Sequence, residues 1–193
     1  MKKFFVLGFI CITFQFNAQE NNTANDFGFN QKDVFVTGTI SFFSTDSNTD
    51  GFSINERFGV DASVGRFFTD HIAAGISAGF SVQNNGERTN NSYNIGVFGR
   101  YYATPENRFS LFGELNAIYA NSEGITPSLA SYGYSLTIAP GINYFLSNAF
   151  ALQARFGQLG YNYNTFKDSD AEVSTFDFRL NLSNINFGLL YKF

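Results

Sequence analysis

The chain is 193 residues long, which suffices for one domain with a core and does not require a second. Its formal net charge is −4, and because an acidic chain repels phosphate backbones, we expect no nucleic acid among its partners. Aromatic residues make up 19% of the chain and charged residues only 15%. Beyond the N-terminus the apolar residues are dispersed rather than gathered in long runs.

The first 18 residues have the order of a secretory signal peptide. Lys2 and Lys3 precede an apolar run from Phe4 to Phe16, and the small residue Ala18 follows it. The run is too short for a helix that crosses a bilayer, which needs about 20 residues. We predict cleavage after Ala18.

The predicted signal peptide, residues 1–18, leaves two further segments. Residues 19–33 fit no strand pattern and are expected to form a short periplasmic lead-in, whereas residues 34–193 are expected to form one folded unit. The single cysteine, Cys11, lies in the signal peptide, so the mature chain is expected to contain no disulfide.

Beyond the lead-in, large apolar residues alternate with small or polar ones. In the first segment Val34, Val36 and Ile40 share one parity, while Thr37 and Thr39 share the other. A period of two is typical of strands with one apolar face. The pattern predicts eight strands and no helix. The segments are 34–42, 58–65, 72–82, 93–101, 109–119, 132–144, 150–157 and 185–193.

The connections between these segments alternate between short and long. Tight turns are predicted around Asp70, Pro105 and Asn148. No connection leaves room for a helical crossover, so consecutive strands should pair antiparallel as a meander, with short turns at one end and long loops at the other. The long polar loops are predicted at residues 45–55, 84–92, 121–131 and 162–175.

The small size of the polar residues indicates which face lies inside. A soluble lipocalin-like barrel fills its interior with bulky apolar residues, whereas here Ser, Thr, Gly and Asn alternate with the bulky residues. Small polar side chains fit a narrow interior and large apolar ones fit lipid. Because backbone polar groups in a bilayer need partners, the sheet must close. The predicted fold class is all-β, an eight-stranded antiparallel up-and-down transmembrane β-barrel.

The last ten residues, NINFGLLYKF, alternate to a final aromatic. With the leader, the eight strands and the alternating connections, this ending resembles the small outer-membrane β-barrels of Gram-negative bacteria, the porin-like family that includes the OmpA transmembrane domain. The resemblance implies location in the outer membrane and contact with its lipid and lipopolysaccharide. It also implies that the outer-membrane assembly machinery recognises Phe187, Leu189, Tyr191 and Phe193 as an assembly signal.

Two irregularities are expected within the strands. Pro140 lacks the N–H group that a strand ladder requires, so a local bulge or a water-satisfied carbonyl is predicted there. Phe176 and Phe178 have even parity, but Ile185 onward is odd, so a second bulge is predicted near Ser183 or Asn184.

Four charged residues share the inward, polar parity: Asp61, Arg100, Glu114 and Arg155. Opposite charges in a narrow interior favour pairing, so they are predicted to form a lumen charge cluster that plugs the barrel. A gate for small ions is the alternative interpretation of the same residues.

The first long loop contains part of a calcium-binding pattern. Asp46, Asn48 and Asp50 match the first half of such a loop, but its twelfth position is Arg57 instead of the required glutamate. Turn formation at a hairpin tip explains the same residues. Calcium binding is therefore only the alternative interpretation of this loop, and we predict neither a metal nor a cofactor.

The only histidine, His71, falls in a predicted short turn, and no nucleophile accompanies it. The predicted function is therefore non-enzymatic: a structural envelope component, or a barrel whose long loops form an adhesion or binding surface for an unknown extracellular ligand. The alternative is a narrow porin-like channel for small solutes or ions. A lipid-modifying outer-membrane enzyme is a weaker alternative.

Overall fold

The computed structural model describes residues 27–45, 55–84, 88–124, 130–169, 171–179 and 186–193. These residues form ten strand segments, and no helix occurs among them. The signal peptide and most of the lead-in lie outside the described residues. The strands are β1 (Val34–Thr45), β2 (Asn55–Phe67), β3 (Ile72–Asn84), β4 (Thr89–Tyr102), β5 (Phe109–Ser122), β6 (Ser131–Phe145), β7 (Phe150–Arg155), β8 (Gln158–Phe166), β9 (Glu172–Arg179) and β10 (Asn186–Lys192).

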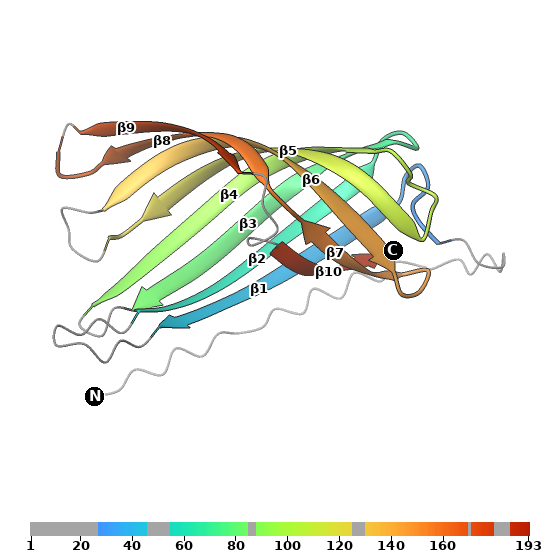
Figure 1. Cartoon of the computed structure of the whole chain (residues 1–193), viewed down its shortest axis with the longest axis horizontal. Helices are drawn as coiled ribbons and strands as arrows, with labels where there is room; N and C mark the ends of the chain where they lie inside the picture. Colours follow the sequence, from blue (N-terminus) through green and yellow to red (C-terminus); the bar gives the residue numbers. More distant parts are fainter. Residues whose placement is uncertain (1–26, 46–54, 85–87, 125–129, 170, 180–185) are drawn as a thin grey trace.

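The ten segments make a closed antiparallel barrel of eight strands, as predicted. β7 and β8 are two parts of one strand that pairs with β6, and β9 and β10 are two parts of the last strand. β10 also pairs with β1, which closes the barrel. Figure 1 shows the strands running obliquely along the long axis, with the short turns, the start of β1 and the C-terminus at one end. We call this the short-turn end and the other the long-loop end.

The fourth long loop is much shorter than predicted. Residues 162–175 were expected to form a loop, but most of them belong to β8 and β9, which pair as a hairpin. The cause is a change of parity along the seventh strand. Phe150 and Leu152 are exposed on the outer face before the change, and Leu159 and Tyr161 after it. The alternation that predicts the seventh strand therefore stops at this change, and the residues of β8 were assigned to a loop.

A bulge opposite Pro140 produces this change of parity. Between the pairs Ile138–Leu159 and Gly141–Arg155, β6 has two residues and its partner has three. β6 itself continues through Pro140, so the bulge predicted at this point is present on the neighbouring strand. Gly157, within the bulge, has a φ of 68°, a conformation that favours glycine. The second predicted bulge, near Ser183 and Asn184, lies outside the described residues.

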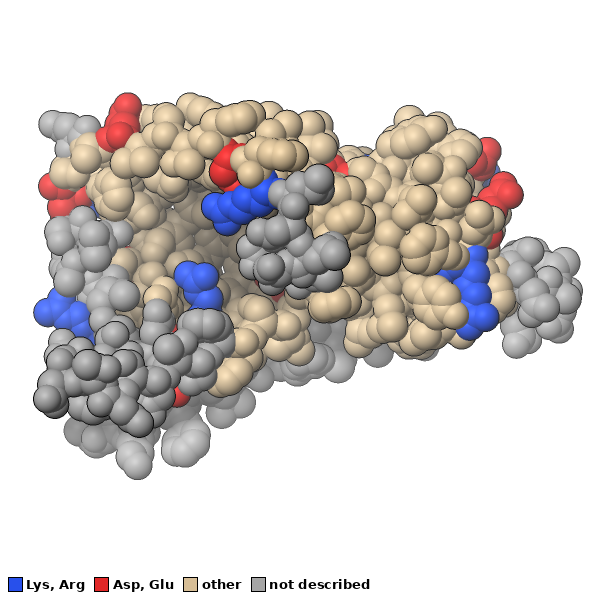
Figure 2. Space-filling model, viewed as in Figure 1, with Lys and Arg blue, Asp and Glu red and all other residues tan. Residues whose placement is uncertain are grey.

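The outer face of the barrel is a belt of exposed aromatic and aliphatic side chains. Ile40, Phe42 and Ile76 are 72%, 73% and 63% exposed, and each occupies an outward position. Figure 2 shows charged side chains near the two ends and around a hollow, with a flank between them that lacks charged residues. An exposed apolar belt of this kind fits a bilayer and would be unstable in water.

The interior at the short-turn end is aromatic, not small and polar as predicted. Its buried side chains are Phe35, Phe67, Phe98, Tyr102, Phe112, Phe145 and Leu190. Glycines make room for these rings. Directly across the strand pairs, Phe35 faces Gly65, Phe98 faces Gly75 and Phe112 faces Gly141.

The space of each glycine is taken up by its aromatic partner. A Cβ on Gly65 would lie 2.4 Å from the Phe35 ring, and one on Gly141 would lie 2.3 Å from the Phe112 ring. Some small inward residues therefore leave room for a large inward side chain on the neighbouring strand. The alternation within one strand cannot show which residues of two strands lie opposite each other.

We predict that an arginine is costly on the belt and tolerated at its edge. Ile76→Arg, in the exposed face of β3, should lower the free energy of unfolding by about 2 to 4 kcal/mol in lipid. The control is Phe68→Arg, because Phe68 is similarly exposed but lies in the turn after β2. It should cost about 0 to 1 kcal/mol. Equal costs in urea unfolding from lipid vesicles would contradict a membrane belt.

Candidate functional site

The lead-in enters the barrel and closes its short-turn end. Phe29 is only 1% exposed, and its ring stacks on Phe67 with centroids 4.6 Å apart. It also packs edge-on against Tyr102 at 5.1 Å and Phe145 at 5.0 Å. Phe29 thus completes the aromatic interior from outside the strands.

Backbone contacts hold Phe29 in this position. Its N–H donates to the carbonyl of Pro105 over 2.8 Å, and Lys192 Nζ donates to the carbonyl of Gly28 over 2.6 Å. Gly28 has a φ of 94°, and a Cβ there would lie 2.3 Å from the Pro105 oxygen. The position therefore requires glycine. Lys192 also lies 3.5 Å from Asp33, which joins the lead-in to the last strand.

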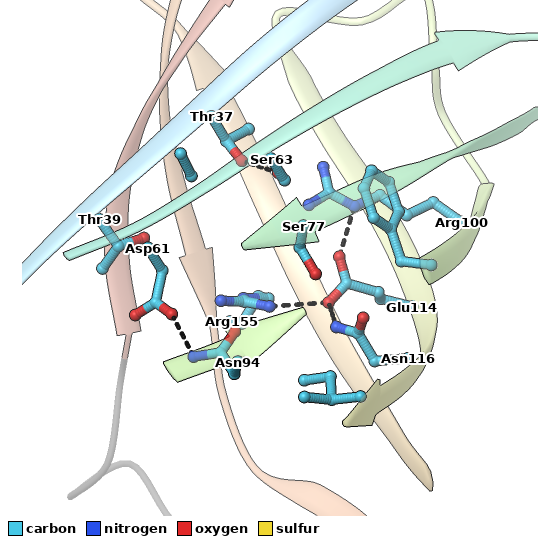
Figure 3. Close-up of a pocket in the computed structure, with 13 residues that line it drawn as sticks. Thr37, Thr39, Asp61, Ser63, Ser77, Asn94, Arg100, Glu114, Asn116 and Arg155 are labelled. Atoms are coloured by element: carbon cyan, nitrogen blue, oxygen red, sulfur yellow. Dashed lines mark hydrogen bonds and ion pairs between the residues drawn. The ribbon is translucent and has the colours of Figure 1, made fainter. Parts of the chain in front are cut away.

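Three of the four predicted lumen charges form one network above this aromatic core. Glu114 Oε2 lies 2.5 Å from Arg100 Nε, and Glu114 Oε1 lies 2.8 Å from Arg155 Nη1. Asn116 Nδ2 donates to the same Oε1 over 2.7 Å. Figure 3 shows the Glu114 carboxylate between the two guanidinium groups. The side chains of Arg100 and Glu114 are each 2% exposed.

Arg100 lies at the boundary between the aromatic and the polar interior. Its guanidinium carbon is 4.8 Å from the ring centroids of both Phe98 and Phe112, a cation–π arrangement. Its Nη1 and Nη2 donate to Tyr102 Oη and Gln153 Oε1, each over 3.3 Å. The buried cation therefore has both ionic and aromatic partners.

Asp61, the fourth predicted charge, is placed differently. Its Oδ1 accepts a hydrogen bond of 3.2 Å from Asn94 Nδ2, and it pairs with neither arginine. Asp61 nevertheless lines the same cavity as Arg100, Glu114 and Arg155. The prediction that all four form a single ion-paired cluster is thus too simple.

The cavity has a volume of about 140 Å³, and its lining extends from the charge network toward the long-loop end, since Asn94 precedes Arg100 on β4. Thr39, Ser77, Asn94 and Asn116 also line it. These neutral residues share the inward parity of the charged ones, but parity alone does not distinguish the residues that line a cavity. Asn116 Oδ1 is buried and has no hydrogen-bond partner among the described residues.

No protein family model matches the sequence, and no curated protein matches it. Solved structures do match. OprG, an outer-membrane protein of Pseudomonas aeruginosa, matches with a TM-score of 0.51 and 12% identity, over 86% of this chain and 98% of its own. The N-terminal β-barrel domain of OprF from the same species matches with a TM-score of 0.51 and 16% identity, over 86% of this chain and 100% of its own. The chain has the fold of the small Gram-negative outer-membrane β-barrels.

A third match is Neisserial surface protein A, with a TM-score of 0.48 and 15% identity, over 83% of this chain and 96% of its own. The likeness to OprG and to the OprF barrel, at 12% and 16% identity, shows the fold and not the activity.

The remaining site predictions concern the calcium pattern and the single histidine. Asp46, Asn48 and Asp50 of the weak calcium pattern fall outside the described residues. Within the part of the chain that the structure describes, no group of three His, Cys, Asp or Glu side chains could hold a metal. His71 Nδ1 lies 2.7 Å from the Tyr102 carbonyl, and its ring stacks on Tyr101. This histidine stabilises a turn.

The C-terminal residues face outward on the belt. Phe187, Leu189 and Phe193 are 67%, 60% and 53% exposed, and Tyr191 is 38% exposed. Tyr191 is paired with Val36 across the closing seam, and the Phe193 N–H donates to the Val34 carbonyl over 2.9 Å. This geometry suits contact with lipid, and recognition by the assembly machinery stays a prediction.

We predict that Glu114→Ala destabilises the barrel by about 3 to 5 kcal/mol, because it leaves the buried Arg100 guanidinium without its carboxylate. The measurement is urea unfolding of the protein refolded in lipid vesicles. Glu123→Ala is the control, since Glu123 is exposed and accepts one hydrogen bond from Asn91. It should change stability by less than about 1 kcal/mol. Similar losses in both variants would contradict a structural role for the charge network.

Proposed function

We propose that this protein is a non-enzymatic outer-membrane β-barrel, sealed at its short-turn end, which supports the envelope and presents its long-loop end as a binding surface. The observation that carries the proposal is the closed base of the lumen. Phe29 and the buried rings around it fill the interior at that end.

The same observation argues against the narrow-channel alternative. A solute that passed through would have to displace the Phe29 ring and then the buried Arg100–Glu114 pair. Both are closely packed, and an eight-stranded barrel has little interior space beyond its own side chains. Passive conduction is therefore expected to be negligible in the native protein.

The enzyme alternative receives no support from the described residues. His71 lies at the short-turn end, where its Nδ1 contacts a backbone carbonyl. An enzyme acting on lipid of the outer leaflet would need its base at the opposite rim. The acidic and basic side chains in the lumen are largely engaged with one another.

The proposed setting follows from the belt and the turns. The belt contacts outer-membrane lipid and lipopolysaccharide, the leader is cleaved, and the short-turn end faces the periplasm. The long-loop end then faces outward, where an extracellular ligand would bind. Exposed apolar side chains on eight strands and the fold shared with solved outer-membrane barrels support this arrangement.

We predict that Phe29→Ala opens the base. Removing the ring should leave a gap among Phe67, Tyr102 and Phe145, so single-channel recordings in planar bilayers should show small, brief conductance events, limited by the Arg100–Glu114 pair, that the unmodified protein lacks. Phe68→Ala is the control, because Phe68 is also at the short-turn end but is 60% exposed. It should remain silent.

Two outcomes would contradict the sealed barrel. One is steady conductance of the unmodified protein, which would favour a channel. The other is conductance of the Phe68→Ala control, judged folded by its altered gel migration before and after boiling; a silent, folded Phe29→Ala variant would instead mean that the remaining rings and the Arg100–Glu114 pair seal the lumen without Phe29. Gly28→Ala gives an independent check, because its Cβ has no space beside Pro105 and should displace the lead-in without removing a ring.

We also predict that deletion of Phe193 impairs insertion in cells more than folding in detergent. Loss of one exposed aromatic should cost no more than about 1.5 to 3 kcal/mol of lipid contact, whereas an assembly signal would be lost altogether. The measurement compares outer-membrane yield with refolding yield. Phe187→Ala is a control for lost apolar area away from the terminus. Equal losses in both assays would exclude recognition of Phe193.

A further inference from the structure

A carboxylate without a cationic partner lines the lumen cavity. Asp61 is exposed there, and its Oδ1 accepts a hydrogen bond of 3.2 Å from Asn94 Nδ2. The carboxylate occupies space that Gly79 leaves directly across the strand pair, since a Cβ on that glycine would clash with Oδ1. Asp61 forms no ion pair within the described part of the chain. Its Oδ2 therefore remains available to a donor in the cavity.

A cationic donor lines the same cavity. Arg155 Nη1 donates to Glu114 Oε1 over 2.8 Å, whereas Nε and Nη2 have no hydrogen-bond partner among the residues that the structure describes. Neither of these two nitrogens is fully buried, and the side chain is 30% exposed. Figure 3 shows the guanidinium with one side against Glu114 and the other directed toward the part of the cavity that holds Asp61. Arg155 therefore keeps N–H donors for a ligand.

The cavity holds positive and negative charge apart. On one side, Arg100 and Arg155 share the single carboxylate of Glu114, so two positive charges meet one negative charge. Asp61 carries the balancing negative charge, but it pairs with neither arginine. The other residues that line the cavity are uncharged. Because little water fits in a narrow interior, each unmatched charge there favours a counter-charge.

This separation discriminates between ligands by their charge. An anion would pair with Arg155 but would be repelled by Asp61. A cation would pair with Asp61 but would be repelled by the excess positive charge of the two arginines. A neutral molecule gains no ion pair at either place. A molecule with a carboxylate and an ammonium group can pair with both residues at once.

We propose that this cavity binds a small zwitterion, namely a free α-amino acid with a small side chain such as glycine or alanine. The ligand carboxylate accepts from Arg155, and the ammonium donates to Asp61 and to the hydroxyl oxygen of Thr39 or Ser77. The volume of about 140 Å³ is well below the roughly 300 Å³ or more of pockets for drug-sized molecules, so the ligand must be small. The inference rests on the proposed function, because it assigns a ligand class to the hollow toward the proposed binding end.

The test uses the mature protein refolded in a non-ionic detergent, because a zwitterionic headgroup would compete for the site. The probes are glycine and L-alanine, and binding is measured by isothermal titration and by saturation-transfer NMR. Two analogues of glycine each carry only one of its charges: N-acetylglycine lacks the ammonium, and glycinamide lacks the carboxylate. We expect saturable binding of glycine or alanine. Both analogues should bind more weakly by roughly tenfold or more, the effect of losing one charge-assisted hydrogen bond.

Variants locate the binding in the cavity. Asp61→Asn should weaken glycine binding by roughly tenfold or more and improve the relative binding of N-acetylglycine, because the repulsion of the anion is lost. Arg155→Gln should weaken glycine binding similarly and improve the relative binding of glycinamide. Asp177→Asn and Arg57→Gln are the matched controls, because neither residue lines the cavity. Since Asp61 is exposed, its variant should fold even if the Arg155 variant does not.

Three results would overturn the proposal. They are no saturable binding of glycine or alanine, an analogue with one charge that binds as tightly as glycine, and glycine binding that Asp61→Asn leaves unchanged. The first would mean that the cavity holds only water. None of these results bears on the sealed base, which the conductance recordings test separately. Conversely, a conducting barrel could still bind an amino acid in detergent.

Discussion

The need to pair every backbone N–H and C=O group inside a bilayer is the constraint on which the rest of this structure depends. A flat amphipathic sheet would leave two edges of unpaired groups in lipid. Here the last strand returns to the first, and the pairing of β10 with β1 closes the barrel. Closure then fixes the other properties, because outward side chains must suit lipid and inward ones must fill a narrow space. Where Pro140 removes a donor, a bulge in the adjacent strand absorbs the defect.

The narrow interior is divided along its length by the size of the inward residues. At the short-turn end, aromatic rings fill the lumen opposite glycines of the next strand, and the lead-in contributes Phe29 to them. Further along, small polar residues leave a cavity. Arg100 connects the two regions, since its guanidinium contacts aromatic rings on one side and Glu114 on the other. A buried ion pair of this kind is weak evidence for high stability, but loss of either partner would leave the other charge buried and unpaired.

This division also relates the fold to the proposed function. A barrel that is filled at one end and hollow toward the other is poorly suited to passage and well suited to presenting a surface. The hollow region combines a carboxylate, amides, hydroxyls and a partly exposed guanidinium. Such a set can bind a polar molecule without an excess of charge. The belt only needs to be apolar, so it places few demands on sequence, which is consistent with the 12% and 16% identity to OprG and the OprF barrel.

The sequence by itself determined the strand class, the outward and inward faces, and three residues of the charge network. Alternation is a local property, so Val34 to Ile40 indicate a strand without reference to the remainder of the chain. Tertiary structure alone decided the features that depend on alignment between distant segments. The docking of Phe29 against Phe145 joins residues far apart in the chain, and the bulge that hides β8 depends on Pro140 of another strand. Likewise, Arg155 of β7 reaches Glu114 of β5 only because strands pack across the lumen.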